Sequence, residues 1–441
     1  MPVTQTTRTT YGQRLKNSGS AIVGGLIMFV IGTIILFWNE GRTIKTTRMI
    51  KQADKECVEL PEVGTLDPSF DGKLVHLTGF ATTEETFADS TFGIFANDIL
   101  SMKREVEYYQ MVERTETETK KKLDGSEEQI TTYYYDEKWV SDPVDSKDFY
   151  DSDRREANWT LVTCEDREYV AQEAVVGAYK LPESMVASLS NEKRMDIHPD
   201  QEYLDAIDEI AKRNFYTRKD LVQVADNSVY IGLNPAQPAI GDVRVRFYAV
   251  PKENVSILAR IQGDSFAEFV HKNGKSMRLI RDGVVSKDEM IEQEKAANKA
   301  LAWGLRILGF LLIYFGLKNI FKFVDSLFKI IPIVTNIVSF GIGLACFIVA
   351  LAWSIIVISV GWIFYRPVLG IIMLVAGAAA IWFVWKKGKE KREAEAAAAP
   401  ANPAPAPAPA PEAPAAPAAP APEAPAPEAP SAPETPADKT E

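Results

Sequence analysis

The feature that most constrains the fold is an uncharged apolar run from Ser20 to Phe37. At about 1.5 Å per residue, a helix of this length crosses a hydrocarbon core of roughly 30 Å. A cleaved signal peptide is the alternative, but the run is too long and no small-x-small cleavage site follows it. Trp38 follows the run, where an aromatic residue is typical of the membrane interface. The sequence therefore predicts a membrane anchor over residues 20–38.

Apolar runs of this kind return only after residue 299, and a long polar segment with strand-like alternation lies between. The predicted fold class is an α+β membrane protein with four transmembrane helices. A large β-rich extracytoplasmic domain is inserted between helix 1 and helix 2. The predicted organisation is a cytoplasmic N-terminus over 1–19, transmembrane helix 1 over 20–38, the domain over 39–299, transmembrane helix 2 over 300–317, an amphipathic interfacial helix over 318–331, transmembrane helix 3 over 336–365, transmembrane helix 4 over 367–385, and a basic stop with a disordered Ala/Pro-rich tail over 386–441.

Within the domain, the clearest local signal is a long hairpin. Residues 104–122 and 126–140 are rich in β-formers and flank Asp124-Gly125, a strong turn signal. A two-residue turn there pairs Lys121 with Glu128, so that opposite charges face each other across the strands. The residues near the turn are polar, which predicts that the tip projects into water.

Lysine and arginine positions predict the orientation. The N-terminus, the segment 318–329 and the segment 386–392 are all basic, and an even number of spans places them on one side. The positive-inside rule then puts both termini in the cytoplasm and the large domain on the opposite side, which is the periplasm or cell exterior in a bacterium and the lumen in a eukaryote. The wet face of the interfacial helix carries the candidate membrane-surface residues Lys318, Lys322 and Lys329.

Arg306 is the most informative single residue, because it lies a few positions inside the second apolar run. Snorkelling of its side chain to the interface is one interpretation. The other is an ion pair with Glu40, the acidic residue placed near Arg306 and Arg366 by the predicted topology. The structural candidates at this interface are Glu40, Arg42, Arg306 and Arg366.

Glycines spaced seven residues apart occur in three predicted spans. Small residues allow two helices to approach closely where lipid gives no hydrophobic driving force. Seven residues are close to two helical turns, so each pair lies on one helix face. Chance is the alternative, since glycine is common in membrane helices. The candidate seams are Gly25 with Gly32, Gly309 with Gly316, and Gly370 with Gly377.

Nothing in the sequence indicates catalysis, and we expect no catalytic residue, no cofactor and no metal site. The histidines are scattered, and no phosphate-binding or nucleophile motif is present. The net charge of −11 disfavours nucleic acid as a partner. Cys57 and Cys164 could form a disulfide or remain two free thiols, and Cys346 lies in a span.

A set of motifs resembles the transmembrane protein 43 (LUMA) family from the first span to the fourth. They are Asn39-Glu-Gly-Arg42, Glu105-Val-Glu-Tyr-Tyr-Gln-Met-Val-Glu113, Tyr133 to Trp139 with Ser146-Lys-Asp-Phe149, Gly241-Asp-Val-Arg-Val245, Ala259-Arg260 with Gly263-Asp264, Trp303-Gly-Leu-Arg306 and Gly361-Trp-Ile-Phe-Tyr-Arg-Pro367. The resemblance implies the same topology and a non-enzymatic role. Animal members are regarded as organisers of complexes at the inner nuclear and endoplasmic-reticulum membrane, with emerin and lamins as partners.

The long Ala/Pro tail departs from the animal members and is typical of a bacterial chain, so those partners do not carry over. We therefore expect an integral, multi-pass protein of the bacterial inner membrane that acts as a scaffold. It would self-associate as a homo-oligomer and organise membrane protein complexes or lipid domains. The expected partners are the lipid bilayer, further copies and unknown membrane proteins. The alternative is an envelope enzyme or a lipid-binding protein with its site in the extracytoplasmic domain.

Overall fold

The computed structural model describes residues 2–9, 11–121, 126–321 and 332–365, with a few single residues between 368 and 387. The chain divides into two units, residues 1–378 and 379–441, and the first holds the elements described below. Most of the predicted interfacial helix, the predicted fourth span and the tail lie outside the described residues.

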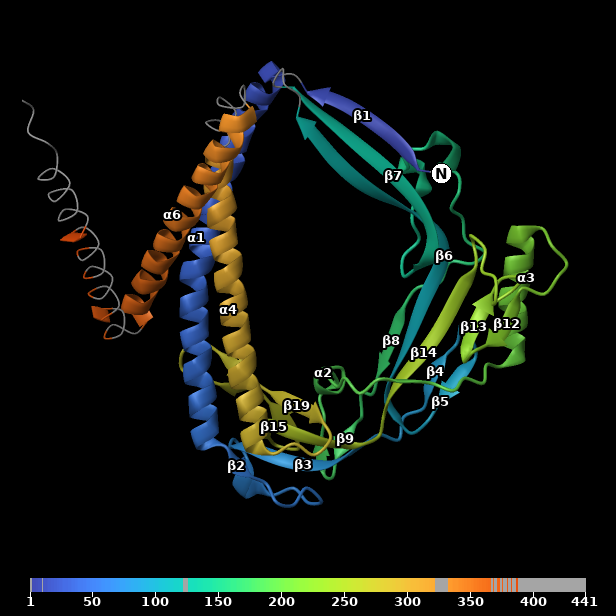
Figure 1. Ribbon diagram of the computed structural model, residues 1–441. Coiled ribbons are helices and arrows are strands. Elements are labelled where there is room, and N and C mark those ends of the chain that lie inside the picture. Colours follow the sequence, from blue (N-terminus) through green and yellow to red (C-terminus); the bar gives the residue numbers. More distant parts are fainter. Residues whose placement is uncertain are drawn as a thin grey trace, which may run out of the picture. The chain divides into compact units, whose positions relative to one another are not determined.

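Three long helices carry the apolar segments (Figure 1). They are α1 (Tyr11–Glu56), α4 (Lys287–Ile320) and α6 (Pro332–Tyr365). Among the described residues, these three helices are long and apolar enough to cross a membrane. Ser286 caps the N-terminus of α4, because its hydroxyl accepts the backbone N–H of Glu289 at 3.3 Å. Both α1 and α4 continue past their apolar parts without a break, so each joins the domain as one rigid rod.

The larger sheet of the domain contains eight strands within the described residues. Its path runs β1-β7-β6-β14-β13-β12, while β8 pairs with β6 and β11 pairs with β14. The strands are β1 (Val3–Thr9), β6 (Ile99–Lys121), β7 (Glu127–Val140), β8 (Arg167–Val170), β11 (Lys193–Arg194), β12 (Val222–Ala225), β13 (Ser228–Ile231) and β14 (Val243–Pro251).

The second sheet lies next to the helices and, in the described part of the chain, has seven strands in the order β19-β15-β16-β10-β9-β3-β2. Its strands are β2 (Val58–Glu59), β3 (Leu74–Thr82), β9 (Val175–Val176), β10 (Tyr179–Lys180), β15 (Asn254–Gln262), β16 (Ser265–Ala267) and β19 (Leu279–Asp282). Shorter elements complete the described part of the domain. Two strand pairs are β4 (Phe87–Asp89) with β5 (Ile94–Ala96) and β17 (Phe269–Val270) with β18 (Ser276–Met277). The helices are α2 (Glu183–Val186) and α3 (Gln201–Phe215), and there are 3-10 turns at Pro68–Phe70, Ser146–Asp148 and Ser152–Arg154.

The predicted hairpin is present as β6 and β7, but its predicted register is wrong by one residue. Lys121 pairs with Glu127 and not with Glu128. The connection is therefore longer than a two-residue turn. At the base, Tyr108 is buried and pairs with Val140. Register is specified where one face is buried and is weakly specified in polar stretches. The base fixes the register, and the charges near the tip do not.

The N-terminal strand β1 covers the outer edge of β7, which the sequence did not predict. The pairing is antiparallel and runs from Val3 opposite Tyr133 to Thr9 opposite Glu127. Its side chains are mostly exposed, and so are those of the distal part of β6. This pairing connects the start of α1 to the far end of the hairpin.

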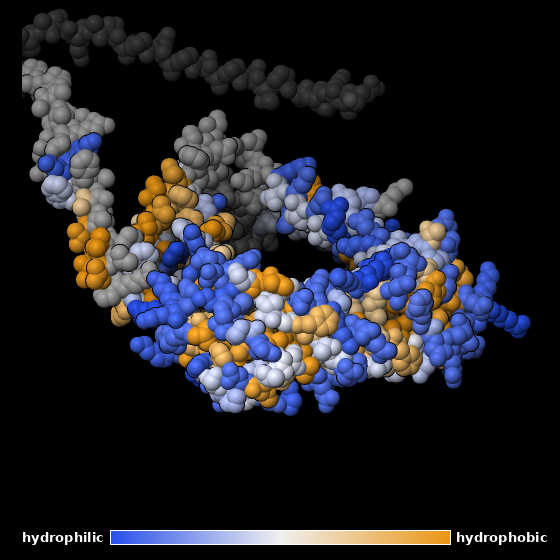
Figure 2. All heavy atoms as spheres, turned by 90° about the horizontal axis from the view of Figure 1, so that it is seen from below, coloured by the Kyte–Doolittle hydropathy of each residue, from blue (hydrophilic) through white to orange (hydrophobic). Residues whose placement is uncertain are grey.

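Buried apolar residues form three clusters. The largest fills the space around both sheets and includes Phe92, Tyr179 and Phe247. The second joins α1 and α4 to the second sheet and includes Ile50 and Met290. The third lies among the apolar parts of the helices: Leu36, Ile313, Ala350 and Val357. The surface of the domain in Figure 2 is mainly hydrophilic, with hydrophobic side chains in small groups, which suits contact with water.

Candidate functional site where the long apolar helices meet the β-rich domain

The structure brings together Glu40 of α1 and Arg306 of α4. The Arg306 guanidinium donates from Nε to Glu40 Oε1 at 2.7 Å and from Nη2 to Glu40 Oε2 at 2.9 Å. Trp362 of α6 donates its indole N–H to Oε2 at 2.6 Å. Glu40 is 1% exposed, and this two-pronged geometry is the strong form of an arginine–carboxylate pair. One carboxylate therefore ties three helices together.

Close backbone approach makes this contact possible. A Cβ atom added to Gly361 of α6 would lie 3.1 Å from Glu40 Cβ, and one added to Gly41 would lie 2.6 Å from the Tyr365 ring. On the α4 side, the Asn39 amide donates to the Ala302 carbonyl at 2.9 Å. The motif Asn39-Glu40-Gly41 thus contacts α4 through its polar side chains and α6 through its glycine.

The glycines of the first two spans face each other deeper in the helix pair. A Cβ atom on Gly25 would lie 2.6 Å from the Gly316 carbonyl oxygen, and one on Gly32 would lie 2.8 Å from the Gly309 carbonyl oxygen. The adjacent Gly24 has nothing within 4 Å of its Cβ position. Two contact points, about two turns apart, set the distance between α1 and α4.

The remaining sequence-predicted residues contribute less to this site. Arg42 is half-buried, donates to the Thr43 hydroxyl at 3.3 Å and has a buried Nε without a partner in the described chain. The Lys318 ammonium lies 5.9 Å from the centroid of the Tyr314 ring. Five predicted residues lie outside the described part of the chain: Arg366, Gly370, Gly377, Lys322 and Lys329.

A cavity of about 200 Å³ lies between α1 and α4, starting at Arg306 and extending toward the domain. Its wall carries Thr43, Thr47, Ile50, Lys295, Asn298, Lys299, Ala302, Trp303 and Arg306. The basic side chains come from α4 at spacings of four and seven residues, which places them on one face of that helix. Sequence reasoning identified only Arg306 of this set, because α1 and α4 are separated by the whole domain.

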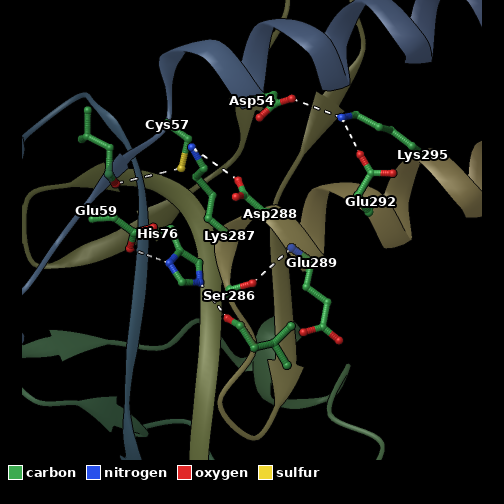
Figure 3. A network of polar contacts seen from close by, with 12 residues as sticks. Asp54, Cys57, Glu59, His76, Ser286, Lys287, Asp288, Glu289, Glu292 and Lys295 are labelled. Carbon is green, nitrogen blue, oxygen red and sulfur yellow. Dashed lines mark hydrogen bonds and ion pairs between the residues drawn. The ribbon is translucent and has the colours of Figure 1, made fainter.

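Figure 3 shows the polar contacts where the helices enter the second sheet. The Lys295 ammonium bridges Asp54 at 3.2 Å and Glu292 at 2.9 Å. The His76 ring contacts the Glu59 carboxylate at 2.7 Å through Nδ1 and the Val285 carbonyl at 3.0 Å through Nε2. These contacts fasten α1, the loop before α4 and the sheet to one another.

Cys57 and Cys164 are separate free thiols in the structure. Burial raises the pKa of the Cys57 thiol to about 12, and burial also raises the pKa of Cys164. A thiol held in its neutral form is a poor nucleophile and a poor metal ligand. Of the two alternatives that the sequence left open, the structure therefore contains the free thiols.

Buried ionisable groups inside the domain are paired within the fold. Arg104 donates to Asp89 at 2.8 Å, and Tyr169 donates to the same carboxylate at 3.0 Å. Tyr230 donates to Asp242, whose carboxyl pKa is raised by burial. Within the described residues, no group of three or more histidine, cysteine, aspartate or glutamate side chains could hold a metal ion. These pairs have the geometry of structural contacts that satisfy buried polar atoms.

Comparison with known proteins gives one consistent family. Residues 108–367 match the family model described as Transmembrane protein 43. The chain is 26% identical to Transmembrane protein 43 of Homo sapiens over 379 residues, which cover 84% of this chain and 90% of the relative. It is 27% identical to the Rattus norvegicus protein over 80% of this chain and 87% of the relative. Identity to the Drosophila melanogaster homolog is 26%, over 84% of this chain and 96% of the relative. No solved structure matches the chain.

Proposed function

Because this chain belongs to the Transmembrane protein 43 family, we propose that it is a non-enzymatic membrane scaffold that self-associates and organises membrane protein complexes or lipid domains. The observation that carries this proposal is the continuity of α1 and α4. Each helix runs from its apolar part into the second sheet of the domain without a break. A domain held by two unbroken helices keeps a fixed orientation relative to the bilayer.

Three sets of contacts support this rigidity. The glycine contacts hold the helices within the apolar part, and the Glu40–Arg306 pair holds them at its end. Beyond it, the apolar cluster that includes Ile50 and Met290 packs both helices on the sheet. A catalyst needs convergent reactive groups, whereas a scaffold needs fixed geometry, and these contacts supply fixed geometry.

The pairing of β1 with β7 bears on which side of the membrane each part occupies. β1 is joined to the start of α1, and the domain follows its end, so a bilayer around residues 20–38 separates the two. To stay paired with β1, the distal hairpin, with charged residues such as Glu118 and Lys120, would have to cross the bilayer. Charged side chains and open sheet edges are excluded from hydrocarbon. We propose that both termini are cytoplasmic, the domain is periplasmic or extracellular, and β1 leaves β7 when α1 inserts.

Release of β1 supports the proposed self-association. The edge of β7 from Glu127 to Tyr133 would then carry unpaired backbone donors and acceptors, which readily take up another strand. Antiparallel pairing of this edge with its counterpart on a second copy gives a two-fold contact that is complete without further partners. We place this assembly in the bacterial inner membrane, with other membrane proteins as further partners.

Native mass spectrometry of the full chain in nanodiscs tests the proposal. The expected result is two or more copies in each particle, with loss of the oligomer when Thr131→Pro removes a backbone donor from β7. Thr163→Pro, in a loop outside both sheets, is the matched control. A single copy per particle at all protein concentrations contradicts the scaffold proposal.

The alternative is a lipid-handling protein or envelope enzyme with its site in the domain. The observation in its favour is a polar depression at the end of α3, lined by Glu209, Lys212, Arg213, Thr217 and Arg218. Lys212 is held there by Asp208 at 2.6 Å and Asp220 at 2.7 Å. Transfer of labelled lipid between vesicles by the full chain, abolished by Arg213→Ala, would favour this alternative over the scaffold.

A further inference from the structure

We propose that the cavity between α1 and α4 binds an anionic phospholipid whose headgroup carries hydroxyl groups, such as phosphatidylglycerol. This goes beyond the proposed scaffold function, and it rests on the proposed insertion of α1 and α4 in the bilayer but not on self-association. The cavity of about 200 Å³ has the volume of about seven waters at roughly 30 Å³ each, which is the scale of a small headgroup.

The position of the cavity corresponds to the headgroup layer. The end of the cavity nearer the apolar part of the helices is Arg306, which pairs with Glu40 two residues after the interfacial Trp38. The end nearer the domain is Lys295, eleven positions earlier on α4, which is about 16 Å along the helix axis. Trp303 on the wall is typical of the interface. The cavity therefore starts where acyl chains end and extends through the depth of the phosphates.

The charge of the wall selects a phosphate. Arg306 and Lys295 are already engaged with carboxylates, whereas Lys299 has no ion pair within the described part of the chain and its side chain is exposed. A phosphodiester next to Lys299 would gain a charge-assisted hydrogen bond and would lie within the field of the other two cations. Three basic residues on one wall disfavour headgroups with an ammonium group.

Asn298 provides the second, independent observation. Its side chain is 8% exposed, and its Nδ2 donates to the Thr43 carbonyl at 3.3 Å and the Thr47 hydroxyl at 3.1 Å. The Thr43 carbonyl can only accept, so the amide orientation is fixed and Oδ1 is the remaining atom. Oδ1 is buried and has no partner among the described residues. An acceptor of this kind requires a donor, and because Asn298 lines the cavity, a headgroup hydroxyl supplies one after a small shift of the amide toward the cavity.

The two requirements together define the ligand class. The wall offers a cation for a phosphate and an acceptor for a hydroxyl, with the exposed Trp303 as apolar surface for the glycerol backbone. Phosphatidylcholine has neither a net negative charge nor a hydroxyl. Phosphatidylmethanol has the phosphodiester charge without hydroxyls. Soluble sn-glycerol 3-phosphate has both groups but lacks the acyl chains.

The test uses the full chain in phosphatidylcholine nanodiscs that contain a minor fraction of one probe lipid. Native mass spectrometry then counts the lipids that remain after transfer to detergent. We expect phosphatidylglycerol to be retained about tenfold over phosphatidylcholine, which is the scale of one charge-assisted hydrogen bond. Phosphatidylmethanol should be retained at an intermediate level. Millimolar glycerol 3-phosphate should not displace the lipid, and displacement would overturn the lipid as the ligand.

Matched variants separate the cavity from general surface charge. Lys299→Gln should lower phosphatidylglycerol retention about tenfold, whereas Lys45→Gln should leave it unchanged, because Lys45 is exposed at the same depth on α1 but outside the cavity. Equal retention in the two variants overturns the site. Asn298→Ala should make phosphatidylglycerol and phosphatidylmethanol equivalent, and a persisting difference overturns the role of Oδ1. The same spectra report the number of copies, so failure of the scaffold proposal remains distinguishable.

Discussion

A methyl group added at Gly25 should separate the two central helices, whereas one added at the adjacent Gly24 should not. The Cβ of Gly25→Ala would lie 2.6 Å from the Gly316 carbonyl oxygen, 3.0 Å from Asn319 Cβ and 3.0 Å from Ile320 Cγ1. Two of these atoms belong to the helix backbone or are attached to it, so no side-chain rotation relieves the overlap. Contacts between carbon atoms are optimal at about 3.5–4.0 Å, so α1 and α4 must move apart by about 0.5–1 Å.

The cost follows from the packing that this movement loses. Overpacking by one methyl group typically costs about 1–3 kcal/mol. Gly24 has no atom within 4 Å of its Cβ position, and replacing a helical glycine by alanine gains about 0.5–1 kcal/mol. The two neighbouring substitutions should therefore differ by roughly 1.5–4 kcal/mol in the free energy of unfolding. On α4, a Cβ at Gly316 would lie 2.7 Å from the Gly25 carbonyl oxygen and 2.8 Å from the Phe29 backbone nitrogen, so Gly316→Ala with Gly304→Ala as its control should show the same contrast.

Reversible unfolding in mixed micelles, followed by the tryptophan signal, measures this difference. Gly25→Ala should lower the midpoint, and Gly24→Ala should leave it unchanged or raise it. Equal midpoints for the two variants would refute the claim that close backbone contact positions α1 against α4. A drop for Gly24→Ala alone would place the seam on the face of α1 that carries Gly24.

Three further predictions concern buried groups. Glu40→Gln leaves the Arg306 charge without a counter-ion and should lower the free energy of unfolding by roughly 3 kcal/mol. The double variant Glu40→Leu with Arg306→Met should lose less stability than the sum of its two single changes, as read from the unfolding midpoints. Additive losses would argue against the pair. Cys57, with its pKa raised to about 12, should resist iodoacetamide near neutral pH in the native protein and react after unfolding. Mass spectrometry counts the alkylated thiols in each state. Rapid labelling of the native protein at Cys57 would contradict its burial. Burial raises the carboxyl pKa of Asp242, so the contribution of this carboxyl group to stability is present at low pH and is lost as pH rises through the folded pKa. The Tm of Asp242→Asn should therefore rise relative to that of the wild type between about pH 4 and pH 7. A constant difference in Tm over this range would refute the prediction.

The contact between Glu40 and Arg306 could be predicted from the sequence because depth along two apolar runs restricts the partners. A cation inside a span needs an anion at the same depth, and Glu40 lies directly after the first run. The glycine spacing similarly defined one face of each helix. Both arguments use only position along a helix, which the sequence contains.

The cavity and the hairpin register could not be predicted, because they depend on how distant segments pack. Asn298 meets Thr43 only after the domain between them has folded and set the rotation of α4 against α1. The register of the hairpin is fixed by the buried side of Tyr108, while the predicted cross-strand charges lie in its polar part, where a slip costs little. The pairing of β1 with β7 could not be predicted, because the short Thr-rich segment shows no apolar alternation typical of a strand. Its position next to basic residues indicated only a polar terminus.

If α1 and α4 hold the domain at a fixed orientation to the bilayer, the distance between a label in the first span and a label in the domain has a narrow distribution. Spin labels on Gly24→Cys, which faces no neighbouring atoms, and on Lys272→Cys, exposed in the domain, would be measured by pulsed electron paramagnetic resonance in nanodiscs. We expect one narrow distance peak, which should broaden when a flexible four-residue Gly/Ser segment is inserted after Glu56 and another before Lys287. A broad distribution in the unmodified chain would contradict the rigid connection and, with it, the basis of the proposed scaffold.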